Sequence, residues 1–261
     1  MEDKVNDKIK VHFIGAGPGA EDLITVRGMR LLSEADVVIY AGSLVNPKLL
    51  EYAPRAEHYN SASMTLEEVI GRIREAVEQG RTVARLHTGD QSLYGAVKEQ
   101  MRELDRLGIA YDSCPGVSAC FGAAAAMNLE YTLPGISQSL IITRMQGRTA
   151  VPERESIRSF ASHGASMAIY LSTALLTELS SELQAGGYEE TTPAAIVYKA
   201  TWPEERILRC TVGTLAETAE QNGIRKTAVI LVGEAIGAEN FEDSRLYAPD
   251  FSTEYRKAKK V

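Results

Sequence analysis

Cysteine is scarce in this sequence, and the cysteines present are not spaced as metal ligands or disulfide partners. There are three, Cys114, Cys120 and Cys210, and no two of them form a Cys-x-x-Cys pair. The odd number argues against a disulfide framework, and the spacing argues against structural zinc. Three of the four histidines, His12, His58 and His163, share no metal-ligand spacing either. We therefore predict no metal site and expect a protein of the reducing cytoplasm.

Long apolar runs and an excess of basic residues are also missing. No apolar stretch approaches the roughly 18 to 20 residues that cross a bilayer. The charged start "MEDKVNDKIK" is not typical of a signal peptide. A net charge of −7 provides no broad basic face for nucleic acid. We expect neither a membrane nor a nucleic acid as partner, but a cleft with a few arginines can still bind an anionic small molecule.

At 261 residues, the chain is longer than a typical single domain. Predicted strands occupy residues 10–17, 35–42, 82–87 and 109–114 in the first half and 139–145, 167–172, 194–201, 206–212 and 227–236 in the second. Only "WPEE", residues 202–205, separates two of the later strands, which is too short for a crossover helix. The sequence thus predicts an antiparallel pair there and a mixed second sheet.

Helical patterns alternate with these strands. We predict a helix over residues 22–32, directly after a glycine-rich loop. Thr65 and Glu68 form a capping box for a second helix that Gly80 ends. The alternation predicts two α/β domains, residues 9–116 and 117–240, followed by a C-terminal tail, residues 241–261.

The loop "GAGPGA", residues 15–20, satisfies the G-x-G-x-x-G/A pattern of dinucleotide-binding loops. Three features argue against a bound diphosphate. Pro18 lacks the backbone N–H that a phosphate cradle uses, and Glu21 and Asp22 would repel the charge. The acidic residue expected at the end of the second strand is absent. The alternative is a tight turn whose glycines permit close packing.

Several other loops of small residues follow predicted strands, where ligands of open α/β sheets bind. They are "HTGDQSLYG" (87–95), "PGVSA" (115–119), "YLST" (170–173) and "YKAT" (198–201). Gly, Ala, Ser and Thr let backbone groups contact a ligand. Such a lining suits a molecule with adenine, ribose and an amino acid but no phosphate.

Three segments resemble the tetrapyrrole (corrin and porphyrin) methyltransferases. They are residues 15–45, 86–96 and 115–153, and the resemblance extends over roughly residues 9–258. "YAGSLV", "LPGISQ" and "TRMQGRTAVPE" are more specific. They point to the branch that methylates carbon 11 of precorrin-4, or of its cobalt complex, in cobalamin biosynthesis.

This resemblance implies two α/β domains with S-adenosylmethionine (SAM) in the cleft between them, S-adenosylhomocysteine as product, and a homodimer. The cofactor-binding residues it implies are Pro18, Gly89, Asp90, Leu93, Ser118, Ala119, Tyr170, Leu171, Ala200 and Thr201. A tetrapyrrole carries acetate and propionate groups that suit basic side chains. The candidate substrate-binding residues are Ser43, Arg85, Arg144, Arg148 and Lys199. Asp90 and His87 are the catalytic candidates, and no general base is evident.

Each candidate also has an alternative interpretation. Asp90 can form an Asx turn, Ser118 can cap a helix, and His87 can be a hydrogen-bonded structural residue. The basic residues can be solvated surface charges. Core packing is the alternative for Tyr170, Leu171, Ala200 and Thr201.

The sequence departs from the family pattern at Gln91, where proline is expected, and at Gln146 and Ala150, where Glu and Pro are expected. Two alternative functions stay open: a related methyltransferase acting at another ring position, and a non-catalytic nucleotide-binding protein of the same fold. Gln91 favours the second of these.

Overall fold

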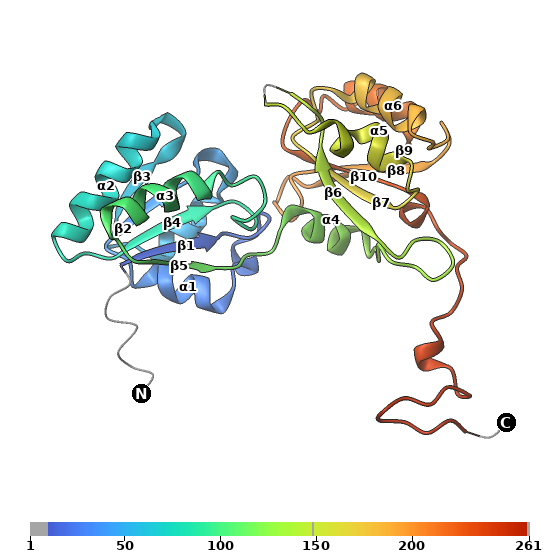
Figure 1. Ribbon diagram of the computed structural model, residues 1–261, viewed down its shortest axis with the longest axis horizontal. Coiled ribbons are helices and arrows are strands. Elements are labelled where there is room, and N and C mark those ends of the chain that lie inside the picture. Colours follow the sequence, from blue (N-terminus) through green and yellow to red (C-terminus); the bar gives the residue numbers. More distant parts are fainter. Residues whose placement is uncertain (1–9, 148, 260–261) are drawn as a thin grey trace. The chain divides into compact units, whose positions relative to one another are not determined.

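Two α/β units make up the computed structural model, which describes residues 10–147 and 149–259 (Figure 1). Of these described residues, the first unit contains those up to Ala123 together with the segment Lys199–Glu205, and the second contains the remainder. This segment follows a strand of the second unit in sequence, yet it belongs to the first unit. The predicted domain limits, residues 9–116 and 117–240, stay a prediction.

Five parallel strands form the sheet of the first unit, in the order β3-β2-β4-β1-β5. Their bounds are β1 Val11–Gly15, β2 Val37–Tyr40, β3 Glu57–Asn60, β4 Val83–His87 and β5 Tyr111–Cys114. Helix α1 (Val26–Ser33) covers one face, and α2 (Leu66–Glu78) and α3 (Val97–Leu107) cover the other (Figure 1). A sheet covered on both faces explains why β1, β2 and β4 are almost continuously buried.

Helix α1 begins later than the sequence predicted. Glu21–Leu23 form a separate 3-10 turn, and the backbone is extended at Ile24 and Thr25. The Thr25 hydroxyl then accepts a hydrogen bond from the Gly28 N–H at 3.1 Å, which caps the helix. The predicted start at Asp22 is therefore wrong, because the extended backbone lets Ile24 enter the core beneath α1.

The capping-box prediction is confirmed at the start of α2. Thr65 accepts from the Glu68 N–H at 3.3 Å, and the Glu68 carboxylate accepts from the Thr65 N–H at 2.7 Å. After the last turn, Gly80 has a φ of +74°, which glycine adopts without strain.

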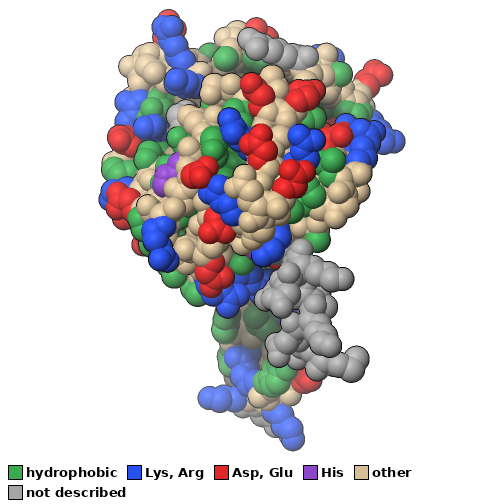
Figure 2. All heavy atoms as spheres, turned by 90° about the vertical axis from the view of Figure 1, so that its left-hand side faces the viewer, with side chains coloured by type: hydrophobic (Ala, Val, Ile, Leu, Met, Phe, Trp, Pro, Cys, Tyr) green, Lys and Arg blue, Asp and Glu red, His purple; other side chains and the backbone are tan. Residues whose placement is uncertain are grey.

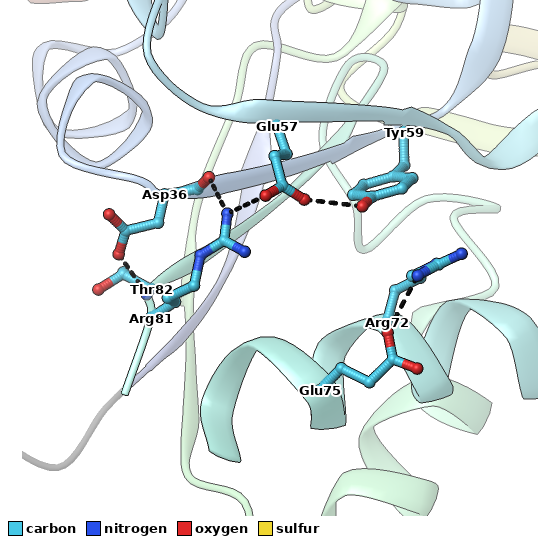
Figure 3. Close-up of polar contacts among 7 residues, drawn as sticks. All are labelled: Asp36, Glu57, Tyr59, Arg72, Glu75, Arg81 and Thr82. Carbon is cyan, nitrogen blue, oxygen red and sulfur yellow. Dashed lines mark hydrogen bonds and ion pairs between the residues drawn. The ribbon is translucent and has the colours of Figure 1, made fainter. Parts of the chain in front are cut away.

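Edge strand β3 was not predicted, because its alternation of apolar residues is weak: Glu57 and Asn60 are exposed and only Tyr59 is half-buried. Polar contacts hold it to β2 and β4 (Figure 3). Arg81 donates to the Asp36 carbonyl at 3.1 Å and pairs with the Glu57 carboxylate at 2.9 Å. Hydrogen bonds from Tyr59 and Arg81 hold the pKa of Glu57 below its ordinary value.

The second unit contains a mixed sheet in the order β6-β7-β10-β8-β9. The strands are β6 Leu140–Arg144, β7 Ser166–Tyr170, β8 Pro193–Tyr198, β9 Arg206–Thr211 and β10 Ala228–Val232. Strands β6 and β7 are parallel, whereas β7-β10, β10-β8 and β8-β9 are antiparallel. This confirms the predicted α/β class with a mixed second sheet, including the antiparallel pair inferred from the short "WPEE" connection.

The described part of the chain contains four further helices. They are α4 (Ala119–Met127), α5 (Ile157–Ala161), α6 (Leu176–Ala185) and α7 (Leu215–Gln221). Leu179 and Leu183 of α6 pack with Ile169 and Ile230 of the second sheet. Between about residue 240 and residue 259, the end of the described chain, the residues are mostly exposed and include the short 3-10 turn Arg245–Tyr247.

Charged side chains of both signs are intermixed on the face shown in Figure 2. On helices of the first unit, oppositely charged side chains one turn apart form ion pairs. Examples are Arg72–Glu75 at 3.0 Å on α2 and Arg106–Glu103 at 2.8 Å on α3. Within the described ranges, no helix has the length and apolar character that spanning a membrane requires.

Candidate functional site

The loops after β1, β4 and β5 meet backbone to backbone at three glycines. A Cβ added to Gly15 would lie 2.6 Å from the Gly116 Cα and 2.7 Å from the Gly89 carbonyl oxygen. Gly17 and Gly89 also exchange backbone hydrogen bonds, 3.2 Å from the Gly17 N–H and 2.8 Å from the Gly89 N–H. The glycines therefore allow a close approach that any side chain would prevent.

The N–H groups of the glycine-rich loop are largely used inside the protein. Ala16 donates to the His87 carbonyl at 2.7 Å, Gly17 donates to Gly89, and Ala20 donates to the Thr201 hydroxyl at 3.0 Å. Pro18 has no N–H to donate. This loop is therefore poorly equipped to bind a diphosphate, in agreement with the sequence argument against a dinucleotide site.

Asp90 holds two of these loops together. Its Oδ2 accepts from the Gly116 N–H at 2.8 Å, and its Oδ1 accepts from the Ser92 N–H at 2.9 Å and from the Ser92 hydroxyl. Burial alone raises the pKa of this carboxyl group, but the hydrogen bonds from Ser92 and Gly116 outweigh it, so the pKa lies below its ordinary value. The ionised carboxylate forms the Asx turn and also links the loops after β4 and β5.

Backbone strain gathers in the loops predicted to bind the ligand. Seven described non-glycine residues have positive φ angles. Five of the seven lie in these loops or directly after one of them: Tyr94 (57°), Ala96 (49°), Leu171 (54°), Lys199 (46°) and Thr201 (68°). Leu171 is in addition 69% exposed despite its apolar side chain. Strained residues of this kind cluster at ligand sites, where the surrounding structure holds them in place.

Arg85 and His87 lie beneath α3 on the same face of β4. Arg85 is only 5% exposed, and its guanidinium donates to Gln100 Oε1 at 2.9 Å and to the Ile39 carbonyl at 3.1 Å. His87 is 4% exposed and stacks on Phe13. Burial, reinforced by the Arg85 charge, lowers the pKa of His87 to about 3. The imidazole is therefore neutral at neutral pH, which favours a structural role over proton transfer.

Replacing His87 with phenylalanine is expected to flatten the loss of stability in acid. An unfolded histidine binds a proton below its ordinary pKa of about 6.5, while the folded imidazole stays neutral down to about pH 3. The wild type should therefore lose about 1.4 kcal/mol more per pH unit below 6.5 than His87→Phe. Urea unfolding at several pH values measures this slope. The exposed His163, changed to glutamine, is the control; equal slopes for wild type and His87→Phe would contradict the buried neutral imidazole.

Gln91 stands in the loop after β4 with a buried side-chain oxygen. The residue is 6% exposed, and its Oε1 has no hydrogen-bond partner among the described residues. A buried acceptor without a partner destabilises a fold. Glutamine, at a position where the family pattern has proline, therefore places in the interior an acceptor to which no described residue donates a hydrogen bond.

Gln91→Pro is expected to raise the free energy of unfolding by about 0.4 to 1 kcal/mol, because proline restricts the unfolded chain. S-adenosylhomocysteine affinity should stay equal or improve. Chemical denaturation and calorimetric titration measure the two effects, and Gln91→Ala separates loss of the amide from restriction of φ. Loss of both stability and affinity in the two variants would mean that the amide makes a useful contact.

The candidate substrate residues make contacts of their own. Arg144 donates to the carbonyls of Met145 and Ala150, each at 3.1 Å, and so fixes the loop after β6. Lys199 pairs with Glu204 at 3.3 Å and lies over the Trp202 ring at 5.3 Å. Arg148 and the Ser43 side chain lie outside the described residues.

Of the ten predicted cofactor residues, eight belong to the first unit and two to the second. Those of the first unit are Pro18, Gly89, Asp90, Leu93, Ser118, Ala119, Ala200 and Thr201, and those of the second are Tyr170 and Leu171. Gly122 of α4, which sequence reasoning missed, lies against Pro18: an added Cβ would be 2.7 Å from the proline Cβ. Among the described residues, no group of three His, Cys, Asp or Glu side chains is arranged to hold a metal ion.

Comparison with known proteins gives consistent matches over most of the chain. Residues 10–216 match the family described as Tetrapyrrole (Corrin/Porphyrin) Methylases. A protein of Methanocaldococcus jannaschii named cobalt-precorrin-4 C(11)-methyltransferase is 51% identical over 252 residues, which cover 96% of this chain and 97% of the relative.

Solved structures of two methyltransferases are also similar. The X-ray structure of a cobalamin biosynthetic enzyme, cobalt precorrin-4 methyltransferase, matches with a TM-score of 0.85 and 46% identity, over 87% of this chain and 96% of that one. A uroporphyrin-III C-methyl transferase from Thermus thermophilus, complexed with S-adenosylhomocysteine, matches with a TM-score of 0.73 and 26% identity, over 88% and 96%. The family pattern and these relatives together confirm the resemblance read from the loops. This chain belongs to the tetrapyrrole (corrin/porphyrin) methylase family.

Proposed function

We propose that this protein transfers a methyl group from SAM to carbon 11 of precorrin-4 or of its cobalt complex, a step of cobalamin biosynthesis. The observation that carries the proposal is the identity of about half of all residues with a relative named for that reaction, along almost the whole of both chains. The segments that distinguish this branch of the family, such as "YAGSLV" and "TRMQGRTAVPE", are part of that length.

The loops of the first unit fit SAM better than a dinucleotide. SAM carries no phosphate, and the glycine-rich loop has few N–H groups left for one. We assign Pro18, Gly89, Asp90, Leu93, Ser118, Ala119, Ala200 and Thr201, with Tyr170 and Leu171 of the second unit, to cofactor binding. The homologous Thermus enzyme bound to S-adenosylhomocysteine supports this ligand class.

The reaction requires chiefly that the protein hold its two reactants in alignment. SAM supplies a methyl group already activated by its positively charged sulfur, so holding the two reactants in line can provide most of the rate enhancement. A neutral, buried His87 fits a reaction that needs no histidine base. The strained turns at Leu171 and at Thr201 each fit a ligand-binding loop whose own conformation is set before the ligand binds.

For the tetrapyrrole carboxylates we propose Ser43, Arg85, Arg144, Arg148 and Lys199. Arg144 would act through the loop that it organises as well as through its own charge. Arg85 would have to exchange its bonds to Gln100 and Ile39 before it could reach a ligand. We also propose a homodimer, on the family resemblance. The three free cysteines support a location in the reducing cytoplasm.

Incubation with SAM carrying a ¹³C-labelled methyl group and a panel of tetrapyrroles tests the reaction. We expect one labelled methyl at carbon 11 of precorrin-4 or cobalt-precorrin-4, located by NMR. Calorimetry should show binding of S-adenosylhomocysteine and none of NAD. A label at another carbon would replace this proposal with that of a related methyltransferase, and ligand binding without transfer to any tetrapyrrole would favour a non-catalytic protein.

A further inference from the structure

Trp202, the only tryptophan of the chain, packs against the glycine-rich loop. Its indole N–H donates to the Pro18 carbonyl at 3.1 Å. The residues are 184 positions apart in sequence, but both belong to the first unit. The connection "WPEE" is therefore more than a link between two strands.

Gly19 makes room for this indole. A Cβ added to Gly19 would lie 2.1 Å from the Trp202 Cδ1 and 2.4 Å from its Nε1. Even a methyl group at position 19 would require the indole or the loop to move, because non-bonded carbon atoms prefer separations of about 3.5 to 4 Å. Tryptophan and glycine are thus complementary in shape.

Further bonds fix the same stretch of loop. The Gly19 carbonyl accepts from Asn46 Nδ2 at 2.8 Å, and the Ala20 N–H donates to the Thr201 hydroxyl at 3.0 Å. Residues 18, 19 and 20 are each held by a different partner. The Pro18 ring also lies against Gly122 of α4. The position of this stretch of the glycine-rich loop is therefore set by contacts from several elements.

The turn that carries Trp202 is itself strained and braced. Lys199 and Thr201 have positive φ angles, and the Glu205 carboxylate accepts from the Thr201 N–H at 2.5 Å. Lys199 lies over the indole ring and pairs with Glu204. A turn held in this way keeps the indole in one orientation.

We infer that Trp202 is a positioning residue for the cofactor site: it holds Pro18 and Gly19 of the glycine-rich loop in the conformation that binds S-adenosylhomocysteine. The inference rests on the proposed function, because that function assigns Pro18 to the cofactor. Trp202 acts through the loop and makes the neighbouring Gly19 intolerant of a side chain.

The test uses the intact chain and S-adenosylhomocysteine as the probe, at a temperature where circular dichroism shows every variant folded. In the wild type, the fluorescence of the single tryptophan should change on titration, with the same half-saturation as calorimetry. Trp202→Phe, which loses one hydrogen bond, should weaken binding about threefold to tenfold. Gly19→Ala should weaken it more than about tenfold and alter the tryptophan emission.

A double-mutant cycle then separates positioning from general destabilisation. Gly19→Ala should cost clearly less affinity in the Trp202→Ala background than in the wild type, because the clash is gone. Gly71→Ala on α2 is the matched control, since its Cβ would meet nothing within 4 Å. Additive effects, or lowered melting temperatures with unchanged affinities, would overturn the inference alone. A wild type that does not bind S-adenosylhomocysteine would overturn the proposed function and, with it, this inference.

Discussion

Replacing Gly116 with alanine is expected to lower the free energy of unfolding by about 3 kcal/mol and to weaken S-adenosylhomocysteine binding at least about a hundredfold. The added Cβ would lie 2.2 Å from the Gly89 carbonyl oxygen and 2.7 Å from the Gly15 Cα. Both are backbone atoms, which cannot rotate away as a flexible side chain can. Relief of the clash would have to separate the loops after β1, β4 and β5.

Urea unfolding and calorimetric titration measure these two effects. Gly71→Ala is again the control, because its Cβ meets no neighbour and alanine stabilises a helix relative to glycine by about 0.5 to 1 kcal/mol. The control should bind like the wild type. Normal stability and affinity in Gly116→Ala would show that the three loops are not packed backbone to backbone.

Replacing Asp90 with asparagine is the second large effect we expect, with about 2 kcal/mol lost in stability and about tenfold in S-adenosylhomocysteine affinity. Asp90 uses both carboxylate oxygens as acceptors, one for Ser92 and one for Gly116. Asparagine has a single oxygen, so its amide nitrogen would face a donor on one side. The link between the two loops would be broken.

The pH dependence provides an independent readout. Because the pKa of folded Asp90 is lowered, its contribution to stability is complete above the ordinary aspartate pKa of about 3.9 and is lost as the pH falls through the lower folded value. Asp90→Asn should lack this acid-dependent loss. Asp105→Asn is the control, since its carboxylate accepts one exposed hydrogen bond, from Tyr111. A variant that keeps full stability but loses the ligand would show that Asp90 serves cofactor binding by direct contact and not through its link between the loops.

These two variants address alternatives that the sequence left open. The glycine-rich loop matched a dinucleotide pattern, yet Pro18, Glu21 and Asp22 already argued against a diphosphate. Those arguments depend only on the chemistry of neighbouring residues, which a sequence displays directly. The role of the glycines as points of close approach needed the positions of Gly89 and Gly116, which come from other strands.

Local patterns determined much of the fold. Apolar runs predicted the main strands, Thr65 and Glu68 predicted the start of α2, and the short connection at residues 202–205 predicted an antiparallel pair. Each of these signals lies within a few residues of the structure that it specifies. Strand β3 was not predicted because its exposed Glu57 is held by Arg81, which also donates to the Asp36 carbonyl, and no local pattern contains these contacts.

The sequence by itself determined the α/β class, the two sheets and the loops at strand ends that match the family. Only the tertiary structure decided which residues of those loops support one another. Asp90 reaches Gly116 across 26 positions, and Trp202 reaches Pro18 across 184. Strand order sets such contacts, because the ends of strands distant in sequence lie side by side in a sheet. Arg85 shows the same limit: its sequence position suggested a ligand contact, whereas burial beneath α3 gives it partners inside the protein.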